Sequence, residues 1–271
     1  MFRFLTVFFL GLFLFSCSVN NTSQKNSTKE THNAEQKEDY SFDLTAVLAN
    51  AHLPESVSSK ILESAIENPA FFQELYVIMQ EDPFLWVLVD KEHRLDADYE
   101  PEDLVELKSG SYTAARAGLF LRDCAVKSLE EMADAAIREG VIFMASSAYR
   151  SYSYQRQVYE RYLNRQDWVA LNRTALPGQS QHQLGLAVDF GSITDYFTQT
   201  AEERWLSANA SRFGWSLSYP RGYENVTGYR EESWHYRYVG KELAKFIDNY
   251  FGGIQQYALR FIYEKQKLDI S

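Results

Sequence analysis

Hydrophobic residues between positions 42 and 82 recur at intervals of three and four, in three runs. The runs are Leu44, Val47 and Leu48, then Val57, Ile61, Leu62 and Ala65, then Phe72, Leu75, Tyr76 and Met79. Pro54 and Pro69 stand where the second and third runs begin, a position that suits the first turn of a helix. The pattern predicts three short helices, which would form a small helical extension over residues 41–82.

The remaining chain alternates helical and strand-like patterns. The longest helical pattern covers residues 114–139 and ends at Gly140. Further helices are predicted at 151–164, 201–213, 240–250 and 254–265, and strands at 141–145, 184–190, 215–219 and 234–239. Residues 83–107 and 165–181 are predicted to be extended chain and loop. Because helices and strands do not alternate strictly, we predict an α+β domain over residues 83–271.

The first 40 residues carry two patterns that are not those of a folded domain. Met1-Phe2-Arg3 and the apolar run 4–15 are typical of a signal peptide. Leu14-Phe15-Ser16-Cys17 resembles a bacterial lipobox, which predicts a lipoprotein signal peptide over residues 1–17 and lipidation of Cys17. Residues 18–40 are almost wholly polar and predict a disordered tether. We expect a membrane-anchored lipoprotein of the bacterial cell envelope, facing the periplasm or the outer surface, with plain secretion as the alternative.

Composition narrows the classes of partner. The chain has 271 residues, of which 45% are hydrophobic, enough for a sizeable core. Its formal net charge is -10, and the sequence has no long cluster of lysine and arginine residues. Binding to the phosphate backbone of nucleic acid requires such a cluster, so nucleic acid is excluded as a partner. We expect the protein to act as a monomer.

Two motifs carry the candidate chemistry. The segment from Ser180 to Asp189 reads S-x-H-x-x-G-x-A-x-D, and E-x-W-H follows at residues 232–235. The imidazoles of His182 and His235 and the carboxylate of Asp189 are three ligands that suit a catalytic zinc ion, with the fourth position left for water. Such a metal lowers the pKa of its water toward neutrality and polarises a carbonyl group. The sequence therefore predicts a metallohydrolase.

Two further residues suit the same reaction. Glu232 lies three residues before His235 and would take the proton of the attacking water, then deliver it to the leaving amine. Arg150, in the segment Tyr149-Arg150-Ser151, would stabilise the oxyanion as a permanent cation.

At these motifs the chain resembles VanY-type D-alanyl-D-alanine carboxypeptidases and LdcB-like L,D-carboxypeptidases. These are zinc peptidases with the α+β fold shared by Hedgehog signalling domains. The resemblance extends from about Pro83 to Tyr250. Its other landmarks are Tyr99-Glu100-Pro101, Ser147 to Tyr152, Tyr154-Gln155, Pro177-Gly178, Thr227-Gly228-Tyr229 and Trp234 to Gly240.

The resemblance implies roles for individual residues. It makes His182, Asp189 and His235 the ligands of Zn²⁺ and Glu232 the catalytic carboxylate. Its implied substrate-binding residues are Arg150, Gln155, Ser180 and Tyr219. For Arg150 two roles stay open, because a cation can stabilise the oxyanion or bind the free carboxylate that an exopeptidase must recognise.

The implied function is removal of the C-terminal D-alanine from peptidoglycan stem peptides. The sequence does not separate D,D-cleavage of a pentapeptide from L,D-cleavage of a tetrapeptide. The alternative is a catalytically inactive peptidoglycan-binding lipoprotein of the same fold. The presence of all three ligand residues together with Glu232 and Arg150 disfavours it. A serine hydrolase is excluded because the chain lacks a G-x-S-x-G motif.

Overall fold

The computed structural model describes residues 42–68 and 70–270. The predicted signal peptide, its Cys17 and the tether lie outside the described residues, so membrane anchoring and the domain boundaries stay predictions. Among the helices of residues 42–68 and 70–270, none combines the length and the apolar character needed to cross a bilayer.

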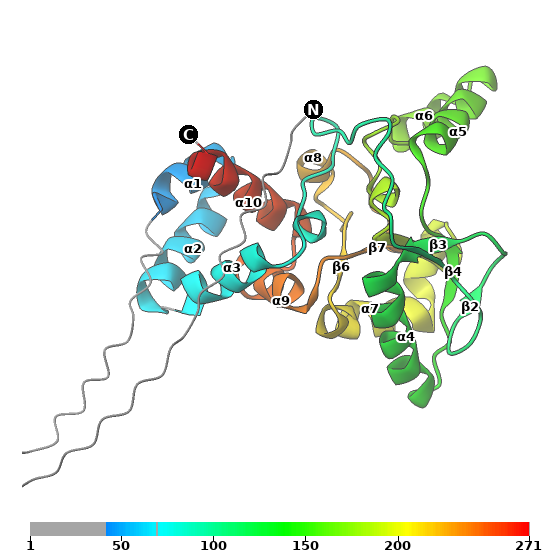
Figure 1. Ribbon diagram of the computed structural model, residues 1–271, viewed down its shortest axis with the longest axis horizontal. Helices are drawn as coiled ribbons and strands as arrows, with labels where there is room; N and C mark the ends of the chain where they lie inside the picture. The colour runs from blue at the N-terminus through cyan, green and yellow to red at the C-terminus, as the bar shows by residue number, and fades with distance from the viewer. Residues whose placement is uncertain (1–41, 69, 271) are drawn as a thin grey trace, which may run out of the picture. The chain divides into compact units, whose positions relative to one another are not determined.

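The N-terminal part holds the three predicted helices. They are α1 (Leu44–Asn50), α2 (Glu55–Glu67) and α3 (Ala70–Gln80). They pack against α9 (Lys241–Phe251) and α10 (Gln255–Ile270) near the C-terminus (Figure 1). The ring of Phe71 on α3 lies 5.2 Å from that of Phe246 and 4.9 Å from that of Tyr250, centroid to centroid. The extension and the C-terminal helices therefore share one hydrophobic core.

A mixed five-stranded sheet carries the centre of the fold. Its strand order is β2 (Thr113–Ala114), β4 (Met144–Ser147), β5 (Ala187–Phe190), β7 (His235–Tyr238) and β6 (Trp215–Leu217). The β2–β4 pair is parallel and the other three pairs are antiparallel. A separate antiparallel pair joins β1 (Leu104–Glu106) to β3 (Phe120–Arg122). Mixed strands with interspersed helices confirm the predicted α+β class.

Helices are held on this sheet by a buried hydrogen bond and by large aromatic side chains. The helix α4 (Asp123–Arg138) is joined to β6 by Ser128, whose hydroxyl accepts a hydrogen bond from Trp215 Nε1 at 2.9 Å. From α7 (Ala201–Asn209), Trp205 packs edge-on against Phe143, and Phe143 in turn contacts Phe190 of β5. The strand β5 is buried along its whole length and forms a rigid support for the residues at its end.

The other helical segments are shorter or lie toward the site. They are α5 (Tyr152–Asn164), α6 (Trp168–Arg173), α8 (Glu224–Thr227) and the 3-10 turns η1 (Pro83–Leu85), η2 (Gln181–Leu184), η3 (Asp195–Gln199) and η4 (Ala210–Phe213). The helices α5 and α6 lie against each other (Figure 1).

Several predicted elements differ from the observed ones, most clearly the following three. The long helix begins at Asp123 instead of 114, because residues 113–114 and 120–122 pair as strands. The first strand predicted after it lies at 144–147 and not at 141–145. Residues 168–173, predicted as loop, form α6, whose start is capped by the side chain of Asp167 accepting from the Ala170 N–H at 2.9 Å. A short capped helix has too few turns to show a clear periodicity.

Candidate active site

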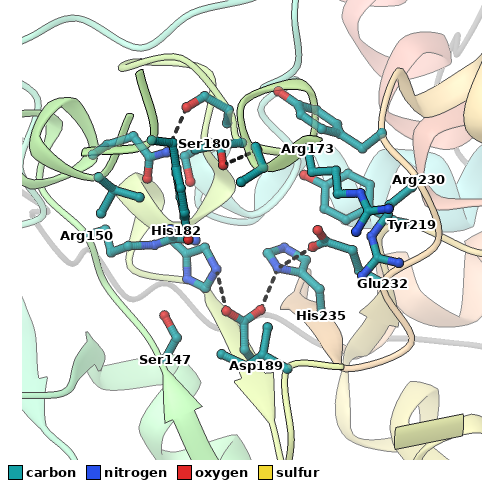
Figure 2. Close-up of a pocket in the computed structure, with 18 of the residues that line it drawn as sticks. Ser147, Arg150, Arg173, Ser180, His182, Asp189, Tyr219, Arg230, Glu232 and His235 are labelled. Carbon is teal, nitrogen blue, oxygen red and sulfur yellow. Dashed lines mark hydrogen bonds and ion pairs between the residues drawn. The ribbon is translucent and has the colours of Figure 1, made fainter. Parts of the chain in front are cut away.

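Three buried side chains converge where β5 and β7 lie side by side. Asp189 on β5 is the direct cross-strand partner of His235 on β7, and His182 comes from η2. Asp189 Oδ1 lies 2.9 Å from His235 Nδ1, and its Oδ2 lies 3.2 Å from His182 Nε2 (Figure 2). One ligand atom of each residue lies within 4.8 Å of the others, so the three could hold one metal ion. The two distant motifs thus meet at one point.

Gly185 makes the turn that brings His182 to Asp189. It ends η2 in the left-handed conformation, at φ 69°. A Cβ atom at this position would lie 3.0 Å from both Arg122 Cγ and Leu104 Cδ2. Only glycine combines that φ with so close a contact. The glycine of the first motif therefore allows the backbone turn between two of the candidate ligand residues.

The environment of His182 fixes its proton. Its Nδ1 lies 2.7 Å from the carbonyl oxygen of Ala148, which can only accept a hydrogen bond, so Nδ1 carries the hydrogen. Burial, with a further contribution from Arg150, lowers the pKa of His182 to about 4, which keeps the ring neutral. The lone pair of Nε2 then points to the Asp189 carboxylate, and this buried atom has no hydrogen-bond donor among the described residues.

A metal cation fits this arrangement. Burial by itself would raise the pKa of Asp189, but the two imidazoles beside it lower the pKa well below its ordinary value, so the carboxyl is ionised. A carboxylate and an imidazole lone pair that face each other in a buried site are stabilised by a cation between them. Two imidazoles and one carboxylate are the donor set of catalytic zinc sites.

Glu232 lies next to this cluster. Its Oε2 is 4.0 Å from His235 Nδ1, and its backbone N–H donates to the carbonyl oxygen of Tyr219 at 3.0 Å. The pKa of Glu232 is raised to about 7, and burial is the largest cause. His235, Arg150 and Arg230 lower this pKa, and Asp189 raises it. A carboxyl group whose pKa is close to neutrality can both accept and return a proton near neutral pH.

The cluster opens into a cavity of about 440 Å³ that three arginines line. They are Arg150, Arg173 and Arg230 (Figure 2). Arg150 Nε is buried without a hydrogen-bond partner in the described part of the chain. Arg230 is held by Asp195, at 2.6 Å, and by the ring of Trp234. Cationic walls of this kind favour an anionic ligand such as a peptide with a free C-terminus.

The remaining predicted site residues line the same cavity. They are Gln155, Ser180 and Tyr219. Gln155 donates through Nε2 to the carbonyl oxygen of Ala175 at 2.7 Å, while its Oε1 has no partner among residues 42–68 and 70–270. The ring of Tyr219 packs over the His235 ring, with centroids 4.8 Å apart. The structure therefore brings all of the predicted residues outside the N-terminus together, and their individual roles stay predictions.

Several cavity residues were not predicted from the sequence. They include Ser147, Tyr162, Asp167, Arg173 and Arg230. The sequence offered one indication that Arg230 lies at the site, since it stands two residues before Glu232. Arg173 had none, because it lies at the end of α6, in a segment that was predicted to be loop.

Comparisons with known proteins agree on one family. A family model described as VanY, D-alanyl-D-alanine carboxypeptidase, matches residues 118–241. The protein YodJ of Bacillus subtilis, provisionally assigned as a carboxypeptidase, is 33% identical over 241 residues, which is 86% of each chain. The structure of the LD-carboxypeptidase LdcB matches with a TM-score of 0.57 and 34% identity, over 63% of this chain and 86% of that one. A mutant of the VanY D,D-pentapeptidase, in complex with Zn(II), matches with a TM-score of 0.54 and 31% identity, over 65% and 99%.

Proposed function

Because the chain belongs to the VanY family of D-alanyl-D-alanine carboxypeptidases, which act in peptidoglycan metabolism, we propose that it is a zinc-dependent enzyme that removes the C-terminal D-alanine from stem peptides. The observation that carries the proposal is the convergence of His182, Asp189 and His235 beside Glu232 in one cavity. The Zn(II) held by the related VanY structure supports zinc as the ion. When bound, Zn²⁺ supplies Lewis acidity that lowers the pKa of a water molecule and polarises a carbonyl.

Glu232 is the proton carrier in this proposal. Its carboxylate takes a proton from the attacking water and passes it to the nitrogen of the leaving D-alanine. Two features support the role: the 4.0 Å distance to His235 Nδ1, and the burial that raises the pKa of Glu232 to about 7. The backbone N–H of Glu232 donates a hydrogen bond to the carbonyl oxygen of Tyr219, and this bond holds the Glu232 backbone in place at the cavity wall.

Arg150 is the proposed contact for the C-terminal end of the substrate. Arg150 affects the pKa of both His182 and Glu232, so its charge lies close to the site of reaction. Its buried, unpartnered Nε is available to a carboxylate or to a developing oxyanion. Gln155, Ser180 and Tyr219 surround the same cavity and would contact the substrate around that charge.

The direct test uses two purified muropeptides, one ending in the tetrapeptide and one in the pentapeptide. Each is incubated with the protein, with the protein after chelation, and with the chelated protein after zinc is restored. Mass spectrometry should show loss of one D-alanine from at least one substrate, abolished by chelation and recovered with zinc. The substrate that is cut decides between L,D- and D,D-specificity. Undiminished cleavage after chelation would refute the zinc-dependent mechanism, and cleavage of neither substrate would favour the inactive binding protein.

We also propose that the protein is a lipoprotein held at the envelope membrane through Cys17. The lipobox-like segment Leu14 to Cys17 and the polar stretch after it support this placement. A Cys17→Ala variant should lose metabolic labelling with a fatty-acid analogue and leave the membrane fraction. Equal labelling of both forms would contradict it.

A further inference from the structure

We propose that Gln181 and Gln255 form a hydrogen-bond relay that fixes the ring proton of His235 on Nε2 and thereby reserves Nδ1 for the metal. In this view Gln181 and Gln255 are positioning residues, and the start of α10 takes part in the metal site. The inference rests on the proposed function insofar as that function requires a metal ion at His182, Asp189 and His235.

The relay is a continuous chain of buried polar atoms. His235 Nε2 lies 3.2 Å from Gln181 Oε1. Gln181 Nε2 donates to Gln255 Oε1 at 3.2 Å, and Gln255 Nε2 donates to the backbone carbonyl oxygen of Ser216 at 3.2 Å. Ser218 adds a second donor to Gln181 Oε1, at 2.7 Å. Gln181 is 2% exposed and Gln255 is 1% exposed, so water does not compete for these bonds.

The Ser216 end of the relay sets the direction of every hydrogen bond in it. The carbonyl oxygen of Ser216 can only accept, so the Gln255 amide must turn its NH₂ group to it and its Oε1 to Gln181. Gln181 must then turn its own NH₂ group to Gln255, which leaves its Oε1 facing His235. An amide oxygen can only accept as well. The hydrogen of the His235 ring is therefore placed on Nε2.

The consequence for the metal site follows from the other ring nitrogen. With the hydrogen on Nε2, the neutral ring of His235 has its lone pair on Nδ1, the atom that lies 2.9 Å from Asp189 Oδ1. The backbone carbonyl oxygen of Ala148 has the corresponding role for His182. It accepts a hydrogen bond from Nδ1 and leaves the lone pair of Nε2 free for the metal. Partners on the far side of a ligating imidazole orient the ring and strengthen metal binding, and their loss costs about 10- to 100-fold in affinity.

A purely structural role for the two glutamines predicts a different result. Two buried amides that only satisfy each other would lower stability when replaced, without a specific effect on zinc. Gln256 provides the matched control. It follows Gln255 on the same helix, is similarly buried at 4% exposure, and donates through Nε2 to Asp90 Oδ2 at 2.7 Å.

The experiment compares Gln181→Leu, Gln255→Leu and Gln256→Leu in the full chain. The zinc dissociation constant is measured by competition with a chromogenic chelator, and thermal unfolding of the metal-free proteins is measured beside it. We expect Gln181→Leu to bind zinc about 10- to 100-fold more weakly and Gln255→Leu to bind more weakly than the wild type by a smaller factor. Gln256→Leu should keep wild-type affinity even where its unfolding temperature falls.

A spectroscopic measurement and a conservative variant complete the test. Long-range ¹H–¹⁵N correlation spectra of the zinc-loaded protein should show His235 protonated on Nε2, and Gln181→Leu should alter this signal. Gln181→Glu keeps an oxygen acceptor for the ring and should bind zinc more tightly than Gln181→Leu.

The outcomes separate the relay from the proposed function. A wild-type chain that binds no zinc would overturn the proposed function and the relay with it. Zinc binding by the wild type with unchanged affinity in Gln181→Leu and Gln255→Leu would overturn the relay alone, as would an equal loss in Gln256→Leu. Should Gln181→Leu fail to fold, Gln255→Leu decides, because Gln255 has no direct hydrogen bond to His235.

Discussion

Asp189 and His235 are direct partners in the antiparallel pairing of β5 with β7. The sheet ladder itself therefore sets the separation of two candidate metal ligands that lie far apart in the sequence. A shift of one residue in this register would turn one of the two side chains to the other face of the sheet. Because β5 is buried throughout and pairs with β4 on its other side, such a shift is strongly opposed. Two of the three candidate ligands thus lie on paired, buried strands, which hold side chains more precisely than loops do.

The first prediction concerns metal binding and stability. Zinc at about 1,000 times its dissociation constant should stabilise the wild type by about 4 kcal/mol, because the ion binds only the folded chain. Asp189→Asn keeps the shape of the side chain but removes the charge between two imidazoles, so the zinc-dependent rise in unfolding temperature should largely vanish. Calorimetry with and without zinc measures the effect. Asp195→Asn, at an exposed carboxylate, is the control and should keep the full rise; a full rise in Asp189→Asn would contradict the ligand assignment.

The second prediction separates catalysis from metal binding. Glu232→Gln should lower kcat by about 10²- to 10⁴-fold, because it removes the group that carries the proton. Zinc content should stay at the wild-type level. Glu231→Gln is a matched neighbour, since Glu231 pairs with Arg221 at 2.7 Å outside the cluster. Rates of D-alanine release and the metal content of each variant are measured together. Normal turnover by Glu232→Gln would remove Glu232 from the mechanism.

The third prediction concerns Arg150. Its replacement by alanine should lower kcat/KM about 10²- to 10³-fold, a range typical for loss of an oxyanion donor. A peptide with a free C-terminus and its C-terminal amide are compared in steady-state assays. A loss confined to kcat would assign Arg150 to the oxyanion, and a rise in KM for the free acid alone would assign it to the carboxylate. Arg156→Ala, on the exposed side of α5, serves as the control. Unchanged kinetics would exclude both roles.

The sequence was informative where chemistry depends on motif spacing. The residues His182, Asp189, Glu232 and His235 stand in two short motifs, and the structure brings them together as those motifs indicate. Periodicity also indicated most of the helices, because long amphipathic runs are selected for packing.

The sequence was uninformative where a contact depends on tertiary structure alone. Gln181 and Gln255 are 74 residues apart, and neither residue type signals a metal site. Gln255 also lies outside the segment, 118–241, that the family model matches. Short strands such as 113–114 and 120–122 owe their conformation to their pairing partners, so their own residues could not predict them.

The fourth prediction concerns the turn before β5. Gly185→Ala should destabilise the protein by about 1 to 3 kcal/mol, because alanine is strained at this φ and its Cβ would lie within 3.2 Å of three side chains. Gly222→Ala is the matched control, since Gly222 has a similar φ of 85° but no neighbouring atom within 4 Å of a new Cβ. Denaturant unfolding gives both values. A loss in Gly185→Ala no larger than in Gly222→Ala would show that the packing around Gly185 contributes nothing.

The last prediction concerns acid stability at Asp90, which ties the segment after η1 to α10. Its carboxylate accepts from the backbone N–H groups of Glu92 and His93, from the His93 ring at 2.8 Å and from Gln256 at 2.7 Å. Burial by itself would raise the pKa of Asp90, but these hydrogen bonds and the charge of His93 lower it below its ordinary value of 3.8.

A carboxyl group with a lowered pKa in the folded state stabilises the protein above its ordinary pKa, and this contribution is lost as the pH falls through the folded value. Asp90→Asn should therefore cost about 1.5 to 3 kcal/mol at pH 7, since it removes hydrogen bonds to a charged acceptor. The difference from the wild type should shrink below pH 4. Urea unfolding at pH 7, 5 and 3 measures it, with the exposed Asp98→Asn as control. A difference that stays constant down to pH 3 would show that the charge of Asp90 is not what stabilises this contact.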